Sequence, residues 1–297
     1  MKKQIKDRII GYILLTVMYI VAFFTGQLIY DMFEIHLLLK VLLMTVSATL
    51  VIFLFSCMLK NSSVYDPYWS VFPIVTAVML YDMGKATHPL AILMLVLIIL
   101  WGIRLTLNWA YTFKGLDYED WRYTKFRTEH PKLWPILNLF GIHMFPTLVT
   151  YLLMLAPICF FDTVNNGTIT TQFNLSSILS IIIMITALII ELLADLQSHI
   201  HRKKYPKTLI NTGLWKVSRH PYYFGEIVFW FGAYLLLISI NNNMWILFLG
   251  PLVNLLMFVF VSIPMMDRRQ LNSKPSFKEY MESTNPLLPI FPPKKDK

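Results

Sequence analysis

The chain has 297 residues, of which 56% are hydrophobic and only 14% are charged, and its formal net charge is +9. Such a composition is too apolar for a soluble globular domain and predicts a polytopic membrane protein. A basic balance can indicate a nucleic-acid partner, but here Lys and Arg form short clusters beside apolar runs, which indicates membrane topology and no nucleic acid. Cys57 and Cys159 lie in separate apolar runs, so no disulfide and no cysteine-based metal site is expected.

Apolar runs long enough to cross a bilayer recur along the chain. They lie near residues 9–30, 35–59, 67–81, 90–113, 136–161, 175–196, 223–240 and 244–266. Because the third and seventh runs are short, we expect eight spans, or seven if one of them is re-entrant. The fold class is therefore predicted to be an all-α integral membrane bundle, with 1–297 as a single transmembrane domain. The first run follows MKKQIKDR without a cleavage site, so it is interpreted as an uncleaved anchor.

Nearly all Lys and Arg residues lie in the N-terminal segment, in the loops 114–132 and 199–220, and in the C-terminal tail. An eight-span chain that obeys the positive-inside rule places these segments and both termini on the cytoplasmic side. The membrane is expected to be a bacterial plasma membrane or the endoplasmic reticulum. The final KKDK is similar to a dilysine retrieval signal, although a basic tail is equally expected on the cytoplasmic side.

Asp66 and Tyr68 mark the beginning of the third apolar run. An acid and a phenol near one point can polarise a carbonyl or pass a proton, which makes both residues candidates for catalysis. The alternative is structural, with Asp66 as the N-cap of a helix that begins at Pro67 and Tyr68 in the interfacial aromatic belt.

The fourth run carries a polar stripe, in which Arg104 is flanked at helical spacing by Trp101, Asn108 and Tyr111. An ionisable residue inside a membrane span favours a functional role. The stripe leads into KGLDYEDWRYTKFR, where acidic and basic residues alternate as in a charge-paired interfacial segment. The alternative for this segment is a solvated loop.

In the sixth run Glu191, Asp195 and His199 recur every four residues and therefore share one helical face. These side chains could bind a metal ion, pair with Arg104, or accept hydrogen bonds from hydroxyl or amide groups of a ligand. The chain has seven His residues, of which only His199 and His201 lie close together, and this inventory is too small for a metal site.

The stretch 211–226, NTGLWKVSRHPYYFGE, places Arg219 and His220 just before Pro221. Proline fits the first turn of a helix, where a missing N–H costs nothing. The positive end of the helix adds to the charge of the two residues, which predicts a site for an anion such as phosphate. The alternative is a juxtamembrane basic cluster that only obeys the positive-inside rule.

Past this helix start, Tyr223, Glu226 and Trp230 fall on one helical face and carry a carboxyl group below the membrane surface. A carboxyl group is costly in lipid and by default indicates function. The alternative is that Glu226 is only hydrogen-bonded inside a helix bundle.

Several strings together resemble the steroid 5-alpha-reductase-like family, specifically its DUF1295 branch. They are NTGLWKVSRHPYYFGE, ELLAD, WGIRL, EDWRY and FKEYMESTNPLLPIFPP, and the resemblance runs from about Asp66 to the C-terminus. It implies a bundle of seven to eight helices that reduces an activated carbon–carbon double bond with NADPH. The implied substrate is a steroid-like or other lipid from the bilayer, and membrane lipids are the other expected partners. The cofactor-binding half of the protein is expected at about residues 100–297.

The resemblance also implies cofactor contacts, position by position. Glu191 and Asp195 take the place of a polar pair, with Arg202 as a cation on the phosphate side. The full implied set is Arg104, Asn108, Glu191, Asp195, His199, Arg202, Asn211, Gly213, Trp215, Arg219, His220, Tyr222, Tyr223, Glu226 and Tyr280.

Three positions depart from the family pattern. Tyr222 stands where the family usually has Asn after RHP, and Trp101 stands where steroid reductases have a catalytic Tyr. Asp66 lies about as far from Arg104 as their catalytic Glu does, although in a different local string. The resemblance therefore supports the cofactor half of the site better than the chemical half, for which Asp66 and Tyr68 are the candidates.

Two other functions remain open. Membrane methyltransferases of the isoprenylcysteine or phospholipid type also carry an RHP-x-Y-x-G string, which there holds S-adenosylmethionine. They usually bring paired glutamates near the final span, whereas residues 266–269 here read MDRR. The second alternative is a lipid-binding protein without catalysis, because a fold does not determine a function.

Overall fold

The computed structural model describes residues 2–84, 88–167 and 173–289, and every regular element in those ranges is helical. Contacts between Cα atoms divide the chain into two compact units. Unit 1 consists of Met1–Ala86 and Ile98–Asp162, and unit 2 consists of Thr87–Leu97 and Thr163–Lys297. The two units are described separately.

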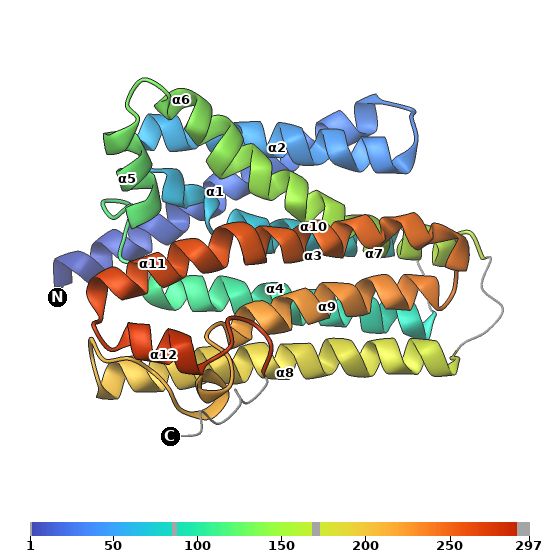
Figure 1. Ribbon diagram of the computed structural model, residues 1–297. Helices are drawn as coiled ribbons and strands as arrows, with labels where there is room; N and C mark the ends of the chain where they lie inside the picture. Colours follow the sequence, from blue (N-terminus) through green and yellow to red (C-terminus); the bar gives the residue numbers. More distant parts are fainter. Residues whose placement is uncertain (1, 85–87, 168–172, 290–297) are drawn as a thin grey trace. The chain divides into compact units, whose positions relative to one another are not determined.

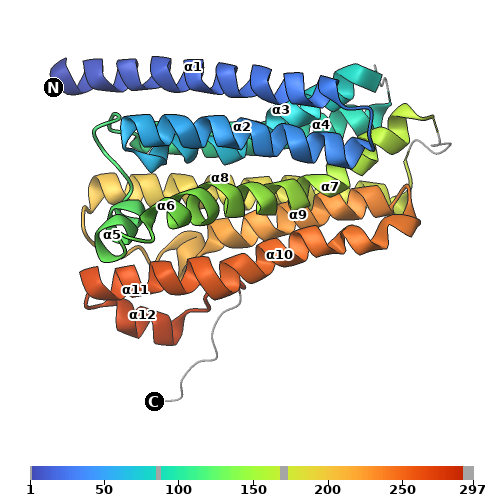
Figure 2. The same ribbon diagram turned by 90° about the horizontal axis from the view of Figure 1, so that it is seen from above.

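Unit 1 holds the first part of the bundle. Its elements are α1 (Lys2–Met32), α2 (Leu37–Leu59), η1 (Ser62–Tyr65), α3 (Tyr68–Gly84), the second half of α4 (Pro89–Thr112), α5 (Trp121–Glu129), α6 (Trp134–Ile136), η2 (Leu137–Met144) and most of α7 (Phe145–Asn165). Helices α1 and α2 lie side by side (Figure 2). Helix α2 ends at Leu59, and its C-cap residue Lys60 has a left-handed backbone, with φ of 51°, that turns the chain towards η1.

Unit 2 holds the rest of the chain. Its elements are the first turns of α4, α8 (Leu175–Lys204), η3 (Gly213–Lys216), α9 (Pro221–Ile238), η4 (Asn242–Phe248), α10 (Leu249–Met257), η5 (Phe258–Ser262), α11 (Ile263–Ser273) and α12 (Phe277–Ser283). Helices α8 and α9 lie side by side along their length (Figure 1). Helix α8 begins with a capping box between Asn174 and Ser177, and α9 begins with Pro221 in its first turn, as predicted.

Two glycines let α9 approach α8 closely. A Cβ atom at Gly225 would overlap the Glu191 side chain and lie 3.0 Å from the Ala187 carbonyl oxygen. A Cβ atom at Gly232 would overlap the side chain of Met184, which also belongs to α8. Small residues at a helix contact are the usual way in which membrane helices pack, because lipid provides little hydrophobic drive for association.

In the part of the chain that the structure describes, seven helical segments are long and apolar enough to cross a membrane. They are Ile5–Met32, Leu37–Leu59, Pro89–Thr112, Trp134–Asn165, Leu175–Lys204, Pro221–Ile238 and Asn242–Ser273. Helix α3 has 17 residues and is the short third run of the sequence. The predicted all-α polytopic bundle of about eight, or seven, spans is therefore confirmed. The sides on which the termini lie stay a prediction.

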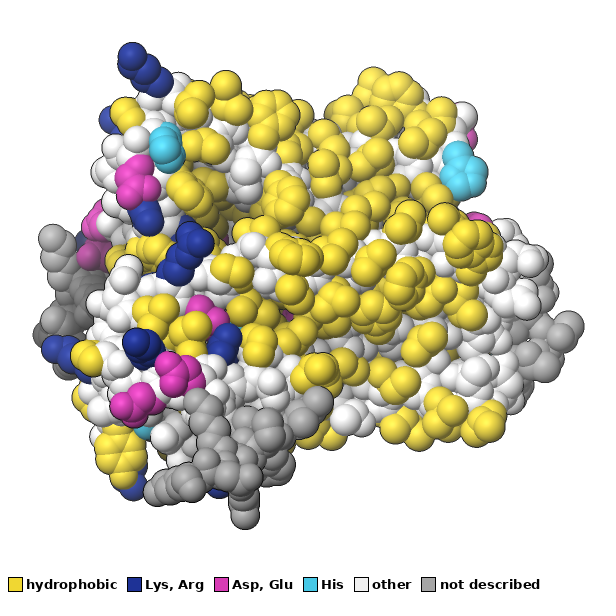
Figure 3. Space-filling view, viewed as in Figure 1, with side chains coloured by type: hydrophobic (Ala, Val, Ile, Leu, Met, Phe, Trp, Pro, Cys, Tyr) yellow, Lys and Arg dark blue, Asp and Glu magenta, His cyan; other side chains and the backbone are white. Residues whose placement is uncertain are grey.

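On the surface of unit 2, apolar and charged side chains lie over different helices. On the face that Figure 3 shows, hydrophobic side chains cover α10, whereas Lys, Arg, Asp and Glu gather over α11 and α12. Phe260 and Val261, in the turn that follows α10, are 72% and 51% exposed, as expected for side chains that contact lipid.

We expect Gly225→Ala to lower the thermal unfolding midpoint of the detergent-solubilised protein. The added methyl group must displace Glu191 or separate α8 from α9, and overpacking of this kind costs about 1–3 kcal/mol. The matched control is Gly141→Ala, because nothing lies within 4 Å of a Cβ atom at this exposed helical glycine. Equal midpoints for the two variants would contradict a close contact at Gly225.

Candidate functional site

The segment between α8 and α9 folds back onto α8. Gly213 has a φ of 60°, and a Cβ atom there would overlap the Gln197 side chain. The Leu214 N–H donates to Gln197 Oε1 at 3.0 Å, and the Trp215 indole donates to the Ala194 carbonyl oxygen at 3.2 Å. Gly213 and Trp215 thus position the loop against α8. Packing of the loop therefore explains why a glycine and a tryptophan occupy these two positions.

Asp267 in α11 binds both basic residues of the RHP string. The Arg219 guanidinium donates to Asp267 Oδ2 at 2.8 Å, and His220 Nε2 lies 2.9 Å from Asp267 Oδ1. The side chains of Arg219 and Asp267 are only 9% and 8% exposed. Arg219 also donates to the carbonyl oxygens of Met281 and Thr284. Its guanidinium is therefore engaged inside the protein, although the sequence predicted that it binds an anion.

The C-terminal segment is fixed to the same loop. The Tyr280 hydroxyl donates to the carbonyl oxygen of Trp215, and burial raises the pKa of this phenol. The Ser218 hydroxyl donates to the Leu287 carbonyl at 2.8 Å, and the Arg219 N–H donates to that of Asn285 at 2.9 Å. Tyr280 thus joins α12 to the loop.

The first turn of α9 carries the half-buried aromatic side chains Tyr222, Tyr223 and Phe224. The His220 ring stacks on Tyr223 with centroids 5.2 Å apart, and the Tyr222 hydroxyl lies 3.4 Å from His220 Nδ1. One turn further on, the Trp230 indole donates to Glu226 Oε1 at 2.8 Å. Glu226 is 3% exposed, and its carboxyl group accepts this hydrogen bond inside the helix bundle. This agrees with the alternative in which Glu226 is only hydrogen-bonded within the bundle.

The face of α8 that carries the predicted polar residues turns towards the interior of unit 2. Glu191 is fully buried beneath Gly225, whereas Asp195 and His199 are half-buried on the following turns. Among the described residues no group of three or more His, Cys, Asp or Glu could hold a metal ion. Asn211, also in the predicted set, is exposed.

Arg202 and Lys274 are two cations of unit 2 whose charges act on each other. Arg202 donates through Nε and Nη2 to the Ser198 hydroxyl, at 3.1 and 2.6 Å. Burial, together with the charge of Arg202, lowers the pKa of Lys274. Neither cation has an ion pair with an acid in the described part of the chain. An anion placed here would relieve the repulsion between them.

In unit 1, Asp66 is paired with a residue that the sequence did not single out. The Tyr123 hydroxyl donates to Asp66 Oδ1 at 2.5 Å. Burial raises the pKa of Asp66 to about 6, although the neighbouring Arg122 and the Tyr123 hydrogen bond lower it. Burial also raises the pKa of Tyr123. The Asp66 side chain is thus a partner of the 121–129 helix rather than an N-cap of α3.

Tyr68 has different surroundings. Its ring packs edge-on against Tyr19, with centroids 5.8 Å apart, and against Tyr65 at 5.5 Å. It is 6% exposed and borders a small apolar pocket of about 40 Å³. Asp66 is thus hydrogen-bonded to Tyr123, whereas Tyr68 packs among aromatic rings, in agreement with their spacing of two residues on a helical path.

The polar stripe of α4 is only partly buried. Trp101 is fully buried and packs edge-on against Trp69, with ring centroids 5.9 Å apart. Arg104 and Asn108 are half-buried, whereas Tyr111 is 66% exposed. Trp101 thus fills the core, and its indole cannot take the place of an ionisable phenol.

Sequence reasoning missed Asp267 and Tyr123. Asp267 lies in the MDRR string at the predicted cytoplasmic end of the last span, on the same side as Arg219. An acid beside a membrane span usually has a basic partner, and this rule could have found the pair. Tyr123 offers no such signal, because its partner Asp66 lies 57 residues away.

We expect Asp267→Asn to destabilise the protein strongly, because Arg219 then remains buried without a compensating charge. Removal of one partner of a buried ion pair costs roughly 3–5 kcal/mol. The thermal unfolding midpoint in detergent measures the effect. Glu279→Gln is the matched control, since this acid lies on the exposed surface of α12. A midpoint as high as that of the control would mean that Asp267 does not hold the loop.

Comparison with known proteins places the chain in a family. No solved structure matches it. An uncharacterized protein of Schizosaccharomyces pombe is 29% identical over 203 residues, which cover 59% of this chain and 57% of the yeast protein, less than two thirds of its length. The family described as "Protein of unknown function (DUF1295)" matches residues 52–284. Because this match covers most of the chain, the protein belongs to DUF1295, a family of steroid 5-alpha-reductase-like membrane proteins.

Proposed function

We propose that the protein is an NADPH-dependent reductase of an activated carbon–carbon double bond in a steroid-like or other lipid substrate from the bilayer. Membership in a steroid 5-alpha-reductase-like family supports this class of reaction. The observation that carries the proposal is the hydrogen-bonded pair of Asp66 and Tyr123, a carboxyl group and a phenol that together can deliver a proton.

The chain's own residues supply the acid of the reaction. When bound, the cofactor supplies a hydride to the β carbon of a conjugated carbonyl compound, and negative charge then develops on the carbonyl oxygen. Protonated Asp66, or the Tyr123 hydroxyl, donates a hydrogen bond to that oxygen and then its proton. The phenol that Trp101 does not provide is thus supplied by Tyr123.

The residues of unit 2 fit a ligand that carries phosphate groups. Arg202 and Lys274 form a cationic pair without an acidic partner among the described residues, which suits an anion. Asp195 and His199 lie one to two turns before Arg202 on the half-buried face of α8, where they can bind hydroxyl or amide groups. Arg219 is better explained as an anchor of the loop, since its Nη1 and Nη2 groups already donate to partners within unit 2.

We expect Arg202→Gln to weaken NADPH binding by about tenfold or more, because a hydrogen bond to a charged group contributes roughly 1.5–3 kcal/mol. The rise of the thermal midpoint with NADPH concentration measures the affinity in detergent. Lys278→Gln is the control, since it removes an exposed charge from α12. Stabilisation of the wild type by S-adenosylmethionine but not by NADPH would replace the reductase with the methyltransferase, and stabilisation by neither would favour the lipid-binding alternative.

We expect Asp66→Asn and Tyr123→Phe each to lower turnover by roughly 10²- to 10⁴-fold, the usual contribution of a positioned acid, while NADPH binding stays near the wild-type level. An acid must be protonated to donate, and the pKa of Asp66 is raised to about 6, so wild-type kcat should fall as pH rises through this value. Asp66→Asn should remove this pH dependence. An unchanged pH profile in Asp66→Asn would exclude Asp66 as the donor.

A further inference from the structure

A second site lies in unit 1, away from the pair of Asp66 and Tyr123. A pocket of about 340 Å³ opens beside the end of α2 and the beginning of α6. This volume lies within the range of ligand pockets, about 300–1,000 Å³. Its lining includes Phe53, Cys57, Lys60, Arg127, Trp134 and Asn138. None of these residues takes part in the proposed reduction.

The mouth of the pocket is positively charged. Lys60 is exposed, and its ammonium group has no acidic partner among the described side chains. Arg127 lies over the Trp134 ring, with its guanidinium carbon 4.6 Å from the centroid. Glu119 binds Arg127 at 2.8 Å and balances one of the two cations, while the Arg127 Nε is buried without a partner. The net charge of the mouth thus favours an anionic ligand.

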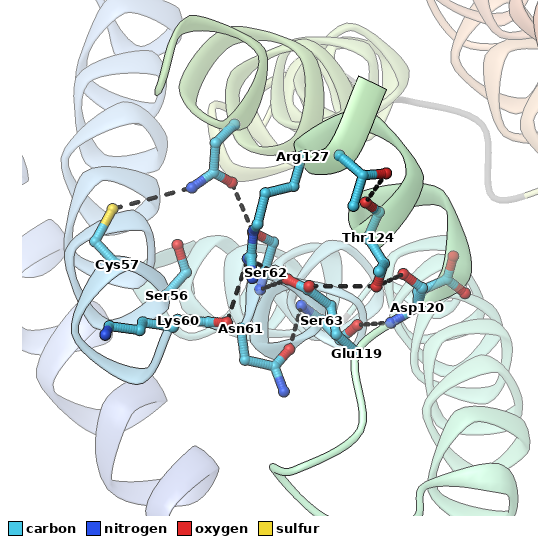
Figure 4. A network of polar contacts seen from close by, with 12 residues as sticks. Ser56, Cys57, Lys60, Asn61, Ser62, Ser63, Glu119, Asp120, Thr124 and Arg127 are labelled. Carbon is cyan, nitrogen blue, oxygen red and sulfur yellow. Dashed lines mark hydrogen bonds and ion pairs between the residues drawn. The ribbon is translucent and has the colours of Figure 1, made fainter. Parts of the chain in front are cut away.

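A network of polar contacts holds the walls in place (Figure 4). Glu119 Oε1 accepts from the Ser62 N–H at 2.8 Å as well as from Arg127, which in turn donates to the Lys60 carbonyl oxygen at 3.2 Å. The Ser62 hydroxyl donates to Asn138 Oδ1 at 2.8 Å. Because these bonds fix the loop after α2, a ligand binds without first ordering the pocket.

The depth of the pocket indicates an amphiphilic ligand. Lys60 directly follows the span Leu37–Leu59, and Trp134 is the first residue of the span Trp134–Asn165, so the cationic mouth lies at a membrane surface. Phe53 lies seven residues before Lys60, which places it about 10 Å deeper along α2. The pocket therefore leads from a charged surface into the hydrocarbon region.

We propose that this pocket binds one anionic phospholipid, with its phosphate group at Lys60 and Arg127 and an acyl chain along Phe53. Basic pockets between membrane helices on the cytoplasmic side are suited to acidic lipid headgroups. The sequence predicts that the end of α2 faces the cytoplasm, where such lipids are abundant. The lipid is a ligand of the membrane surface and is distinct from the substrate of the reductase.

Cys57 provides a direct test, because it is exposed and lines the pocket. We expect dioctanoyl phosphatidylglycerol, added to the full-length protein in detergent, to slow alkylation of Cys57 by N-ethylmaleimide about tenfold at roughly ten times its Kd, since the unliganded fraction falls as 1/(1 + [L]/Kd). Dioctanoyl phosphatidylcholine should protect far less. Cys159, the other cysteine, is buried, and its alkylation reports unfolding.

Two variants locate the effect. Lys60→Gln removes the charge but keeps most of the side chain, and it should abolish protection by phosphatidylglycerol. Lys125→Gln is the matched control, because Lys125 lies on α5, pairs with Glu129 at 3.8 Å and does not line the pocket. This variant should be protected as well as the wild type.

Four results would each overturn the proposal. They are an absence of protection by phosphatidylglycerol, equal protection by the two lipids, protection that persists in Lys60→Gln, and equal protection by glycerol phosphate. The second result would indicate apolar contact only, and the last would indicate a soluble phosphate ligand in place of a lipid.

Discussion

The fold of unit 2 depends on the carboxylate of Asp267, which lies in a helix that otherwise continues an apolar membrane span. It binds Arg219 and His220 together, and neither of these buried side chains has an acid of its own within the RHP string. A buried charge is costly unless it is paired and hydrogen-bonded. The position of the loop before α9 therefore follows from a residue in α11.

This pairing determines which other groups of unit 2 can act on a ligand. Because Arg219 is bound to Asp267 and to the carbonyl groups of the C-terminal segment, Arg202 at the end of α8 is the better candidate for a phosphate contact. The charge of Arg202, together with burial, lowers the pKa of Lys274. Tyr280, in turn, connects the α12 segment to the loop.

In unit 1, one short junction serves two different purposes. Residues 60–66, between α2 and α3, are bound to the segment 116–127 through Asn61, Glu119 and Tyr123. The far end of the junction presents Asp66 to a phenol, and the near end presents Lys60 to a pocket at the membrane surface. The same hydrogen bonds thus hold a candidate proton donor and a candidate lipid site.

The sequence by itself determined the class of fold and the residues that share a helix. Composition was sufficient for an all-α bundle, because backbone groups in lipid must be satisfied within each span. Helical spacing correctly grouped Glu226 with Trp230, which are hydrogen-bonded one turn apart, and Pro221 marked the beginning of α9. The family resemblance depended on short local sequence strings, which can be read without the fold, and the family match over residues 52–284 confirmed it.

Only the tertiary structure decided which groups of different elements meet. Arg219 and Asp267 are 48 residues apart, and Asp66 and Tyr123 are 57 apart. Local spacing predicts neighbours on one helix, whereas contacts between helices depend on how the apolar faces and the small residues pack. For this reason the sequence predicted an anion at Arg219 but could not predict that its guanidinium pairs with the carboxylate of Asp267.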